Sequence, residues 1–236
     1  MSGWLSNGFS LATLPLTGNE RLVADTQLSS GALPETEAVS MSQAFQYFGG
    51  GGTLPWVAGR FYGMPPSTTP VATLTTASVL VAYPLYIPAT AIKTASVNVT
   101  TPQTGGNAHV GIYADNGAGY PGSLVYDFGA QGALTATGSV TVTPTTAVSL
   151  NSGLYWIASI YTATSTFPSV IGITSAYTNP LPAQLGFDTL AHAVATSGEA
   201  ATGITVAGTY GALPATYPAS ATLSLNTTTP AVFFGV

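Results

Sequence analysis

A chain of 236 residues is long enough for one large β domain with an accessory segment. A domain of this size buries roughly 70% of the surface that its unfolded chain exposes, so a core needs no staples. Three basic residues and a net charge of −5 exclude a nucleic-acid-binding surface, because phosphate binding needs several clustered cations. The chain has no cysteine, so disulfides and thiolate metal sites are excluded too.

The neutral composition favours a protein that is held in an assembly. Only 5% of the residues are charged, against roughly 25% in ordinary soluble proteins. A free monomer normally stays soluble through mixed surface charge. A neutral secreted β-protein is the alternative. Thr, Ser, Pro and Gly break every apolar run before it reaches the roughly 20 residues of a spanning helix, so no membrane insertion is expected.

Residues 1–58 are predicted to form an extended attachment arm with one short strand and one short helix. Turn-forming residues interrupt 17–34 too often for a long regular element. The helix is expected over 36–48, where Thr36 suits the N-cap and Glu37 favours the positive end of the helix dipole. The charged residues expected to serve attachment are Glu20, Arg21, Asp25, Glu35 and Glu37.

Four consecutive glycines follow the predicted helix. An ordered glycine run loses much conformational entropy, so a flexible hinge is expected here, with a tight loop inside one domain as the alternative. Prolines stiffen a second connection at residues 64–70. The predicted display domain therefore spans 59–236. The hinge residues are Gly49, Gly50, Gly51 and Gly52.

The pattern of residues 59–236 is typical of β-structure. Turn signals separate β-branched, aromatic or alternating runs at intervals of roughly ten residues, which indicates an antiparallel β-sandwich or a jelly-roll-like fold. Residues 154–161 predict a strand buried on both faces. Pro84 predicts an edge position or a bulge. The expected strands are 79–87, 96–100, 109–113, 123–127, 140–142, 154–161, 170–173, 183–187, 204–210, 221–225 and 231–236.

No pattern of residues points to catalysis or to a cofactor. The turn cluster 115–122 offers one carboxylate, whereas calcium takes six to eight oxygens, so a structural turn is preferred over a metal loop. His109 and His192 show no zinc spacing, and no Ser-His-acid frame is recognisable. We therefore expect a protein without enzymatic activity, metal or cofactor. A glycosidase or esterase is the alternative.

Aromatic side chains are the remaining candidates for ligand binding. Tyrosines at loop tips can stack on sugars, and neutral polar surroundings suit a carbohydrate ligand. Ordinary packing at the ends of the sandwich is the alternative for each of them. The candidates stand beside or near Gly or Pro, and they are Tyr120, Tyr177, Tyr210 and Tyr217.

Several blocks together resemble a family of tail-fibre-like and head-attached structural proteins of tailed bacteriophages and prophages, over about residues 58–236. The N-terminal segment 17–31 resembles attachment segments at the start of several phage structural proteins. The resemblance implies a β-sandwich, no known catalysis and frequent homotrimers. The blocks are RFYGMP (60–65), YPLYIP (83–88), VGIYADNGAGYPGSLV (110–125), GLYWIA (153–158) and TYGALP (209–214).

The expected function is that of a virion structural protein on the outer surface of a tailed phage, assembled in the bacterial cytoplasm. A capsid decoration or head-fibre role is preferred because the chain is short and has no long shaft. The alternative is a tail fibre or a receptor- or glycan-binding module for host adsorption. The expected partners are the major capsid protein or a tail or portal component, further copies in a homotrimer, and a host surface glycan.

Overall fold

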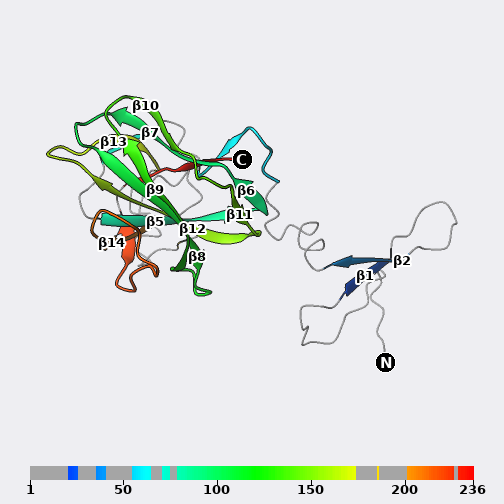
Figure 1. Ribbon diagram of the computed structural model, residues 1–236. Coiled ribbons are helices and arrows are strands. Elements are labelled where there is room, and N and C mark those ends of the chain that lie inside the picture. Colours follow the sequence, from blue (N-terminus) through cyan, green and yellow to red (C-terminus); the bar gives the residue numbers. More distant parts are fainter. Residues whose placement is uncertain are drawn as a thin grey trace. The chain divides into compact units, whose positions relative to one another are not determined.

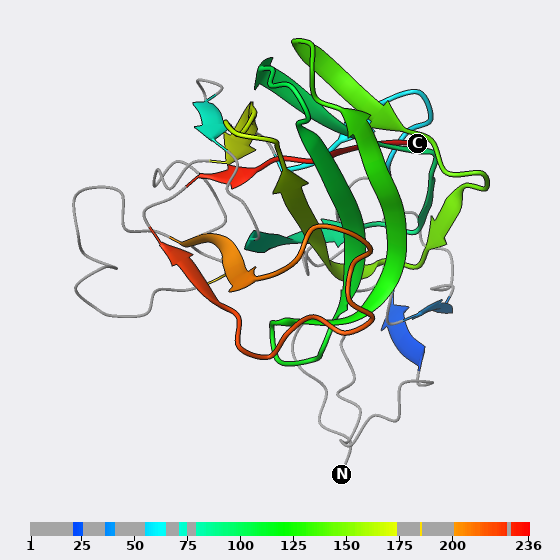
Figure 2. The same cartoon turned by 60° about the vertical axis from the view of Figure 1, so that its left-hand side comes forward.

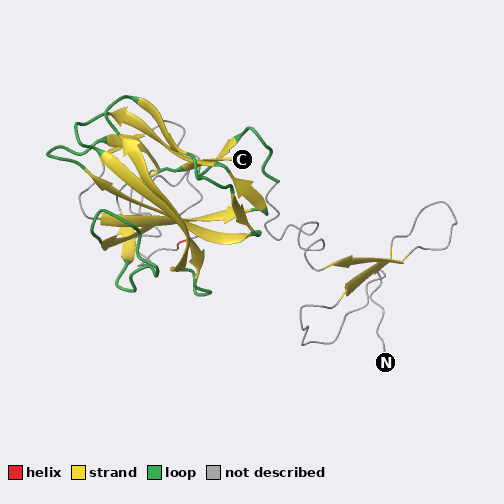
Figure 3. Cartoon of the chain, viewed as in Figure 1, coloured by secondary structure: helices red, strands yellow, loops and turns green. Residues whose placement is uncertain are grey.

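The computed structural model describes residues 21–25, 36–40, 55–64, 71–74, 79–173, 185, 201–225 and 228–236. The chain divides into two units, residues 1–54 and 55–236, four residues before the boundary placed from the sequence. Strands make up almost all of the described regular structure, and every strand pairing is antiparallel (Figure 3). The all-β prediction is therefore confirmed.

The first unit contains one antiparallel pair, β1 (Arg21–Asp25) and β2 (Thr36–Ser40). The helix predicted to begin at Thr36 is wrong there, because residues 36–40 form β2. Thr36 and Val39 are β-branched and favour a strand, and a short isolated helix is marginal in water, so pairing with β1 wins. Residues 41–48 lie outside the described residues.

The residues predicted to serve attachment are divided between described and undescribed positions. Arg21 and Asp25 lie at the two ends of β1, and Glu37 lies in β2 opposite Ala24. The remaining predictions lie outside the described residues, namely Glu20, Glu35 and the hinge glycines Gly49, Gly50, Gly51 and Gly52.

The second unit is built on a six-stranded sheet with the order β15-β14-β5-β12-β8-β9. Its central strands are the long apolar runs of the sequence, which pair over seven or eight consecutive positions. The six strands are β5 (Val79–Ile87), β8 (Asn107–Asp115), β9 (Pro121–Ala133), β12 (Gly153–Thr162), β14 (Ala201–Ala207) and β15 (Thr222–Leu225).

A seven-stranded sheet packs against it (Figures 1 and 2). Its order is β16-β13-β7-β17-β3, with β10 added on β7 and β4 added on β13, while β6 and β11 form a separate pair. These strands are β3 (Phe61–Tyr62), β4 (Val71–Leu74), β6 (Thr90–Ile92), β7 (Thr94–Thr101), β10 (Gly138–Val142), β11 (Val148–Leu150), β13 (Ser169–Ile173), β16 (Thr229–Pro230) and β17 (Phe233–Gly235).

The main core lies between these two sheets, as in a β-sandwich. Alternate residues of each strand point inward, including Val97 of β7, Val110 of β8 and Ile157 of β12. Tyr83 ties the layers together, because its hydroxyl donates to the carbonyl of Val232 (3.2 Å) and accepts from the Val232 N–H (3.0 Å). Burial raises the pKa of Tyr83 well above its ordinary value.

A second core lies on the outer face of the six-stranded sheet. Trp156, Ala158 and Ile160 of β12 point to this face, and they are covered by the loop 208–221, which contributes Leu213 and Tyr217. Because Ile157 and Tyr161 point to the main core, residues 156–161 are buried on both faces, whereas Leu154, at the start of the predicted range 154–161, is exposed. We call the segment 208–221 the covering loop.

Pro84 occupies a local edge of the six-stranded sheet. β14 pairs with β5 only from Val79 to Ala82, whereas β12 pairs with β5 from Val81 to Ile87. Among the described residues, β5 therefore has one partner strand at Pro84, so the missing N–H of the proline does not interrupt the pairing with β14. The prediction of an edge strand is not met for β5 as a whole, which lies between β14 and β12, and it applies only to the end of β5 that carries Pro84. Leu185 is the described residue of the strand predicted at 183–187, and it is not in a strand.

Candidate functional site

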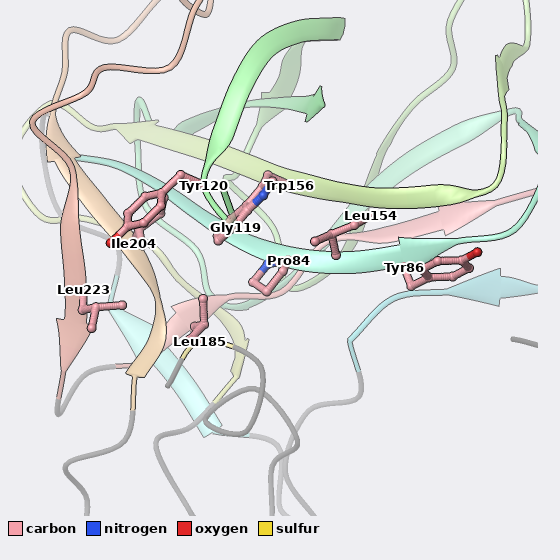
Figure 4. Close-up of a pocket in the computed structure, with 9 residues that line it drawn as sticks. All are labelled: Pro84, Tyr86, Gly119, Tyr120, Leu154, Trp156, Leu185, Ile204 and Leu223. Carbon is pink, nitrogen blue, oxygen red and sulfur yellow. The ribbon is translucent and has the colours of Figure 1, made fainter. Parts of the chain in front are cut away.

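An apolar pocket of about 410 Å³ lies on the outer face of the six-stranded sheet. Two cross-strand pairs form its floor: Pro84 of β5 lies opposite Trp156 of β12, and Tyr86 lies opposite Leu154. Residues two apart in a strand share a face, so the two pairs form one continuous strip. Figure 4 shows this strip between Tyr86 and Tyr120. We call this pocket the tyrosine groove.

Tyr120 comes from the turn between β8 and β9, and the backbone of that turn is held by its own polar groups. The Asn116 Oδ1 accepts hydrogen bonds from the N–H groups of Ala118 (2.8 Å) and Tyr120 (3.3 Å). The Asn116 N–H donates to the Tyr120 carbonyl (2.8 Å). Gly117 and Gly119 take φ values of 86° and 76°, which side-chain-bearing residues rarely adopt. The turn therefore holds Tyr120 at the rim of the groove.

The groove gathers an unusual amount of exposed apolar surface. Tyr86 is 43% exposed, Tyr120 46% and Leu154 38%, whereas Trp156 is 1% exposed. These three are half of the six large hydrophobic side chains that are exposed in the described part of the chain. Clustered apolar exposure of this kind marks interaction sites more often than scattered exposure does. The remaining lining residues are Gly119, Leu185, Ile204 and Leu223.

The carboxylate of Asp115 fixes the floor of the groove. Its Oδ1 accepts a hydrogen bond from the Trp156 Nε1 (2.9 Å), and its Oδ2 accepts one from the Gly117 N–H (2.8 Å). Both oxygens are therefore engaged by the protein, which supports the structural-turn interpretation of residues 115–122. Within the described ranges, no group of three or more His, Asp or Glu side chains could hold a metal ion.

A second polar cluster anchors the covering loop. The His109 Nε2 is hydrogen-bonded to the Asp127 Oδ1, which also accepts a hydrogen bond from the Gly129 N–H (2.7 Å). The Asp127 Oδ2 accepts from the Leu213 N–H (3.1 Å). The His109 ring also meets the edge of Tyr210, with 6.2 Å between ring centroids. Since both carboxylate oxygens are engaged, this cluster is arranged to hold the fold.

The four tyrosines predicted from the sequence have different surroundings. Tyr120 is exposed at the groove. Tyr217 is only 4% exposed, and its hydroxyl donates to the Leu80 carbonyl (3.2 Å), so the prediction that it could stack on a sugar is wrong. Its position beside Pro218 indicated a loop, but the loop folds back over the sheet. Burial raises the pKa of Tyr217 above its ordinary value, with a smaller contribution from Tyr113.

Tyr210 and Tyr177 are not placed at the groove. Tyr210 is half-buried against His109, and burial raises the pKa of its hydroxyl. Tyr177 lies outside the described residues. The groove residues that sequence reasoning missed are Tyr86 and Leu154. The available signal for Tyr86 was its place two residues after Pro84 in the same strand, which puts both side chains on one face of the sheet.

Comparisons with known proteins identify no family. No family model matches the chain, and no curated protein matches it. Among solved structures, the cysteine protease and lectin-like domains of Cwp84, a surface layer associated protein of Clostridium difficile, align with 78% of this chain at 9% identity and a TM-score of 0.40. The alignment covers 38% of that chain. A likeness at this level bears on neither the family nor the function of this protein.

No helix in the described part of the chain is both long enough and apolar enough to cross a membrane.

Proposed function

We propose that the chain is a non-enzymatic structural protein displayed on the outer surface of a tailed-phage particle, as a capsid decoration or head-fibre protein. One observation carries this proposal: the chain divides into a small unit and a large unit, and the fraction of charged residues is much higher in the small unit. Residues 1–54 hold five of the eleven charged residues, whereas the 182 residues of the β-sandwich unit hold six. This division suits an anchor joined to a display domain. A tail-fibre location is the alternative.

The described part of the first unit is suited to attachment to a partner. Its described part is the two-stranded ribbon β1–β2. An isolated two-stranded ribbon is marginally stable in water at best. We therefore expect the ribbon to be stabilised against a partner, either the major capsid protein or a tail or portal component.

Two described acidic side chains of the second unit support a role without catalysis. Asp115 holds the indole of Trp156, and Asp127 holds His109 and the covering loop. A general acid or base must reach a substrate with its proton-accepting atom. The carboxylate oxygens of these two residues are instead occupied by groups of the fold.

Homotrimeric assembly is part of the proposal and rests on the neutral surface and on exposed apolar groups near β3. Phe61 of β3 is 64% exposed, and Val57 in the preceding turn is 47% exposed. β3 has one pairing partner among the described strands, β17, so it presents an open edge there. Light scattering of the full chain at micromolar concentration should give three times the monomer mass, and a stable monomer contradicts the trimer.

Attachment is tested by comparing the full chain with a variant that lacks residues 1–54. The deletion ends at the boundary between the units, so the sandwich should retain its strand signature in circular dichroism and its cooperative urea transition. Full-length protein should attach to particles that lack it, and the truncated protein should stay in the supernatant. Attachment of the truncated protein contradicts the proposed anchor. Imaging of labelled full-length protein on the particles distinguishes the head from the tail.

A further inference from the structure

We propose that the tyrosine groove binds an uncharged glycan chain, with one hexopyranose ring against Tyr86 and another against Tyr120. This adds a binding activity to the proposed structural role and does not depend on it. The two tyrosines lie at opposite ends of an apolar floor that contains Pro84, Leu154 and Trp156 (Figure 4). Two aromatic faces separated by an apolar strip offer two stacking positions for a repeating ligand.

The size and openness of the groove select an amphipathic ligand. Its volume of about 410 Å³ lies within the range of roughly 300–1,000 Å³ that is typical of small-molecule sites. The flanking tyrosines are nearly half exposed, so a bound ligand keeps one side in water. A wholly apolar chain would remain partly hydrated there. A pyranose ring fits better, because it has a face of C–H groups for the floor and hydroxyls for the water.

The charge of the groove selects a ligand without ionic groups. The two cations of the sandwich unit lie on the other sheet, Arg60 just before β3 and Lys93 between β6 and β7. The groove therefore offers no described cation to a phosphate, sulfate or carboxylate, which bind best through charge-assisted hydrogen bonds. Asp115, close to the floor, already accepts hydrogen bonds from Trp156 and Gly117, so it does not attract a cationic ligand strongly.

The backbone at the groove disfavours an extended peptide. A peptide that adds to a sheet edge gains affinity from main-chain hydrogen bonds. The local edge of β5 carries Pro84, which has no N–H to donate. The recognition surface is therefore made of side chains, and these are aromatic and aliphatic. A proline-rich peptide, which docks on aromatic grooves without pairing its backbone, is the rival ligand.

Hydrogen bonds within the protein hold the groove in shape. Trp156 is fixed by its hydrogen bond to Asp115, and Tyr120 is held by the Asn116 turn. A site that is ordered in advance loses less conformational entropy on binding. Tyrosine adds contact area at a low entropic cost, because its side chain has only two rotatable angles.

The test is isothermal titration calorimetry of the full chain with four uncharged hexaoses: cellohexaose, maltohexaose, mannohexaose and chitohexaose. At least one should bind with a millimolar or lower Kd. Tyr86→Ala and Tyr120→Ala should each raise that Kd by about tenfold, which equals about 1.4 kcal/mol. Val125→Ala removes part of an exposed apolar side chain outside the groove and should leave the Kd unchanged.

Further variants distinguish the contribution of ring stacking to binding from that of the tyrosine hydroxyl and from a loss of folding. Tyr86→Phe and Tyr120→Phe keep the ring, so each should stay within about threefold of the parent Kd if stacking dominates. All variants should keep the urea midpoint of the parent, since both side chains are exposed. Three results overturn the proposal: no binding of any hexaose at millimolar concentration, unchanged binding in the double alanine variant, or tyrosine-dependent binding of a proline-rich peptide or sulfated hexasaccharide in place of the uncharged glycans.

Discussion

The two halves of the outer face of the six-stranded sheet carry similar apolar residues but have different surroundings. Over one half, the covering loop buries Leu80 and Tyr113. Over the other half, Tyr86 and Leu154 remain exposed in the tyrosine groove. Trp156 belongs to both halves, because it packs in the second core and lines the groove. Burial on this face is therefore decided by the reach of the covering loop.

Hydrogen bonds explain why the covering loop stops where it does. Its Leu213 N–H donates to Asp127 (3.1 Å), and its Pro214 carbonyl accepts from the Tyr113 hydroxyl (2.8 Å). The Tyr217 hydroxyl reaches the Leu80 carbonyl (3.2 Å). All three bonds attach the loop to one half of the face. A fourth, longer contact lies at the border with the groove, where the Tyr217 hydroxyl is 3.4 Å from the carbonyl of Ile204, a residue that lines the groove.

The largest effect is expected from removing the residue that the two halves share. Trp156→Ala leaves a cavity under both halves of the outer face and should lower the free energy of unfolding by about 3–5 kcal/mol. Trp56→Ala is the matched control, since Trp56 is only half-buried and stacks on Tyr62 with 4.7 Å between ring centroids. It should cost about 1 kcal/mol. Urea unfolding measures both, and equal losses would contradict a shared support role for Trp156.

A smaller difference in unfolding free energy is expected between alanine substitutions at two glycines, one under the covering loop and one away from it. A Cβ at Gly111 would lie 2.3 Å from the Leu213 Cδ1 and 2.9 Å from the Tyr126 carbonyl oxygen. Gly111→Ala should therefore push Leu213 of the covering loop away and cost about 1–3 kcal/mol. A Cβ at Gly153 meets its first neighbour only at 3.7 Å, so Gly153→Ala should be nearly neutral. Similar urea midpoints for the two variants contradict tight packing under the loop.

Tyr217→Phe tests the anchoring of the covering loop more gently. It removes the hydroxyl that bonds to the Leu80 carbonyl and leaves the ring, which packs edge-on against Tyr113 at 5.2 Å. Loss of one such bond should cost about 1 kcal/mol at neutral pH. An unchanged urea midpoint would show that the hydroxyl adds nothing to the attachment of the loop.

The stability of the parent protein should also depend on pH through the Tyr217 hydroxyl, which Tyr217→Phe lacks. Burial raises the pKa of Tyr217 above the ordinary value of 10.0. The stabilisation that depends on its proton is therefore complete below pH 10.0 and falls as the pH rises beyond it. Unfolding followed from neutral to alkaline pH should show a steeper loss for the parent than for Tyr217→Phe. Parallel curves contradict the raised pKa.

The smallest effect on stability is expected at the groove. Tyr86→Ala removes a side chain that is nearly half exposed, and it should change the free energy of unfolding by no more than about 0.5 kcal/mol. Urea unfolding of this variant provides the contrast with the covered half. A loss comparable to that of Trp156→Ala would show that Tyr86 supports the core and is not available for a ligand.

The long strands could be predicted from the sequence because burial of a strand has a recognisable pattern. Burial on one face gives alternating apolar and polar residues, and burial on both faces gives a continuous apolar run. The run at β5 and the apolar pattern of β12 are examples, and both strands form where they were predicted. β3 and β16 have two residues each, which is too short for any period. The helix expected at Thr36 failed because its capping pattern is local, whereas the pairing partner in β1 is more than ten residues away.

The candidate site could be predicted only in part. Tyr120 was found because its turn has a strong glycine and asparagine signature. Tyr217 was misplaced because a proline-flanked segment reads as an exposed loop, and only the long-range bond to Leu80 buries it. Tyr86 was missed because it lies inside a strand whose open half is defined by the distant end of β14.

The tie between Tyr83 and Val232 has a consequence for how the domain forms. These residues are 149 positions apart in the chain, and β5 and β7 likewise pair with the late strands β14 and β17. Folds dominated by such distant contacts close slowly, because a long loop must be ordered before its contacts form. During synthesis, β5 has no β14 to pair with until residues beyond 200 leave the ribosome. One edge of β5 is therefore unpaired until then. Slow, late closure of this kind makes prompt capture by partner subunits or chaperones an advantage during assembly.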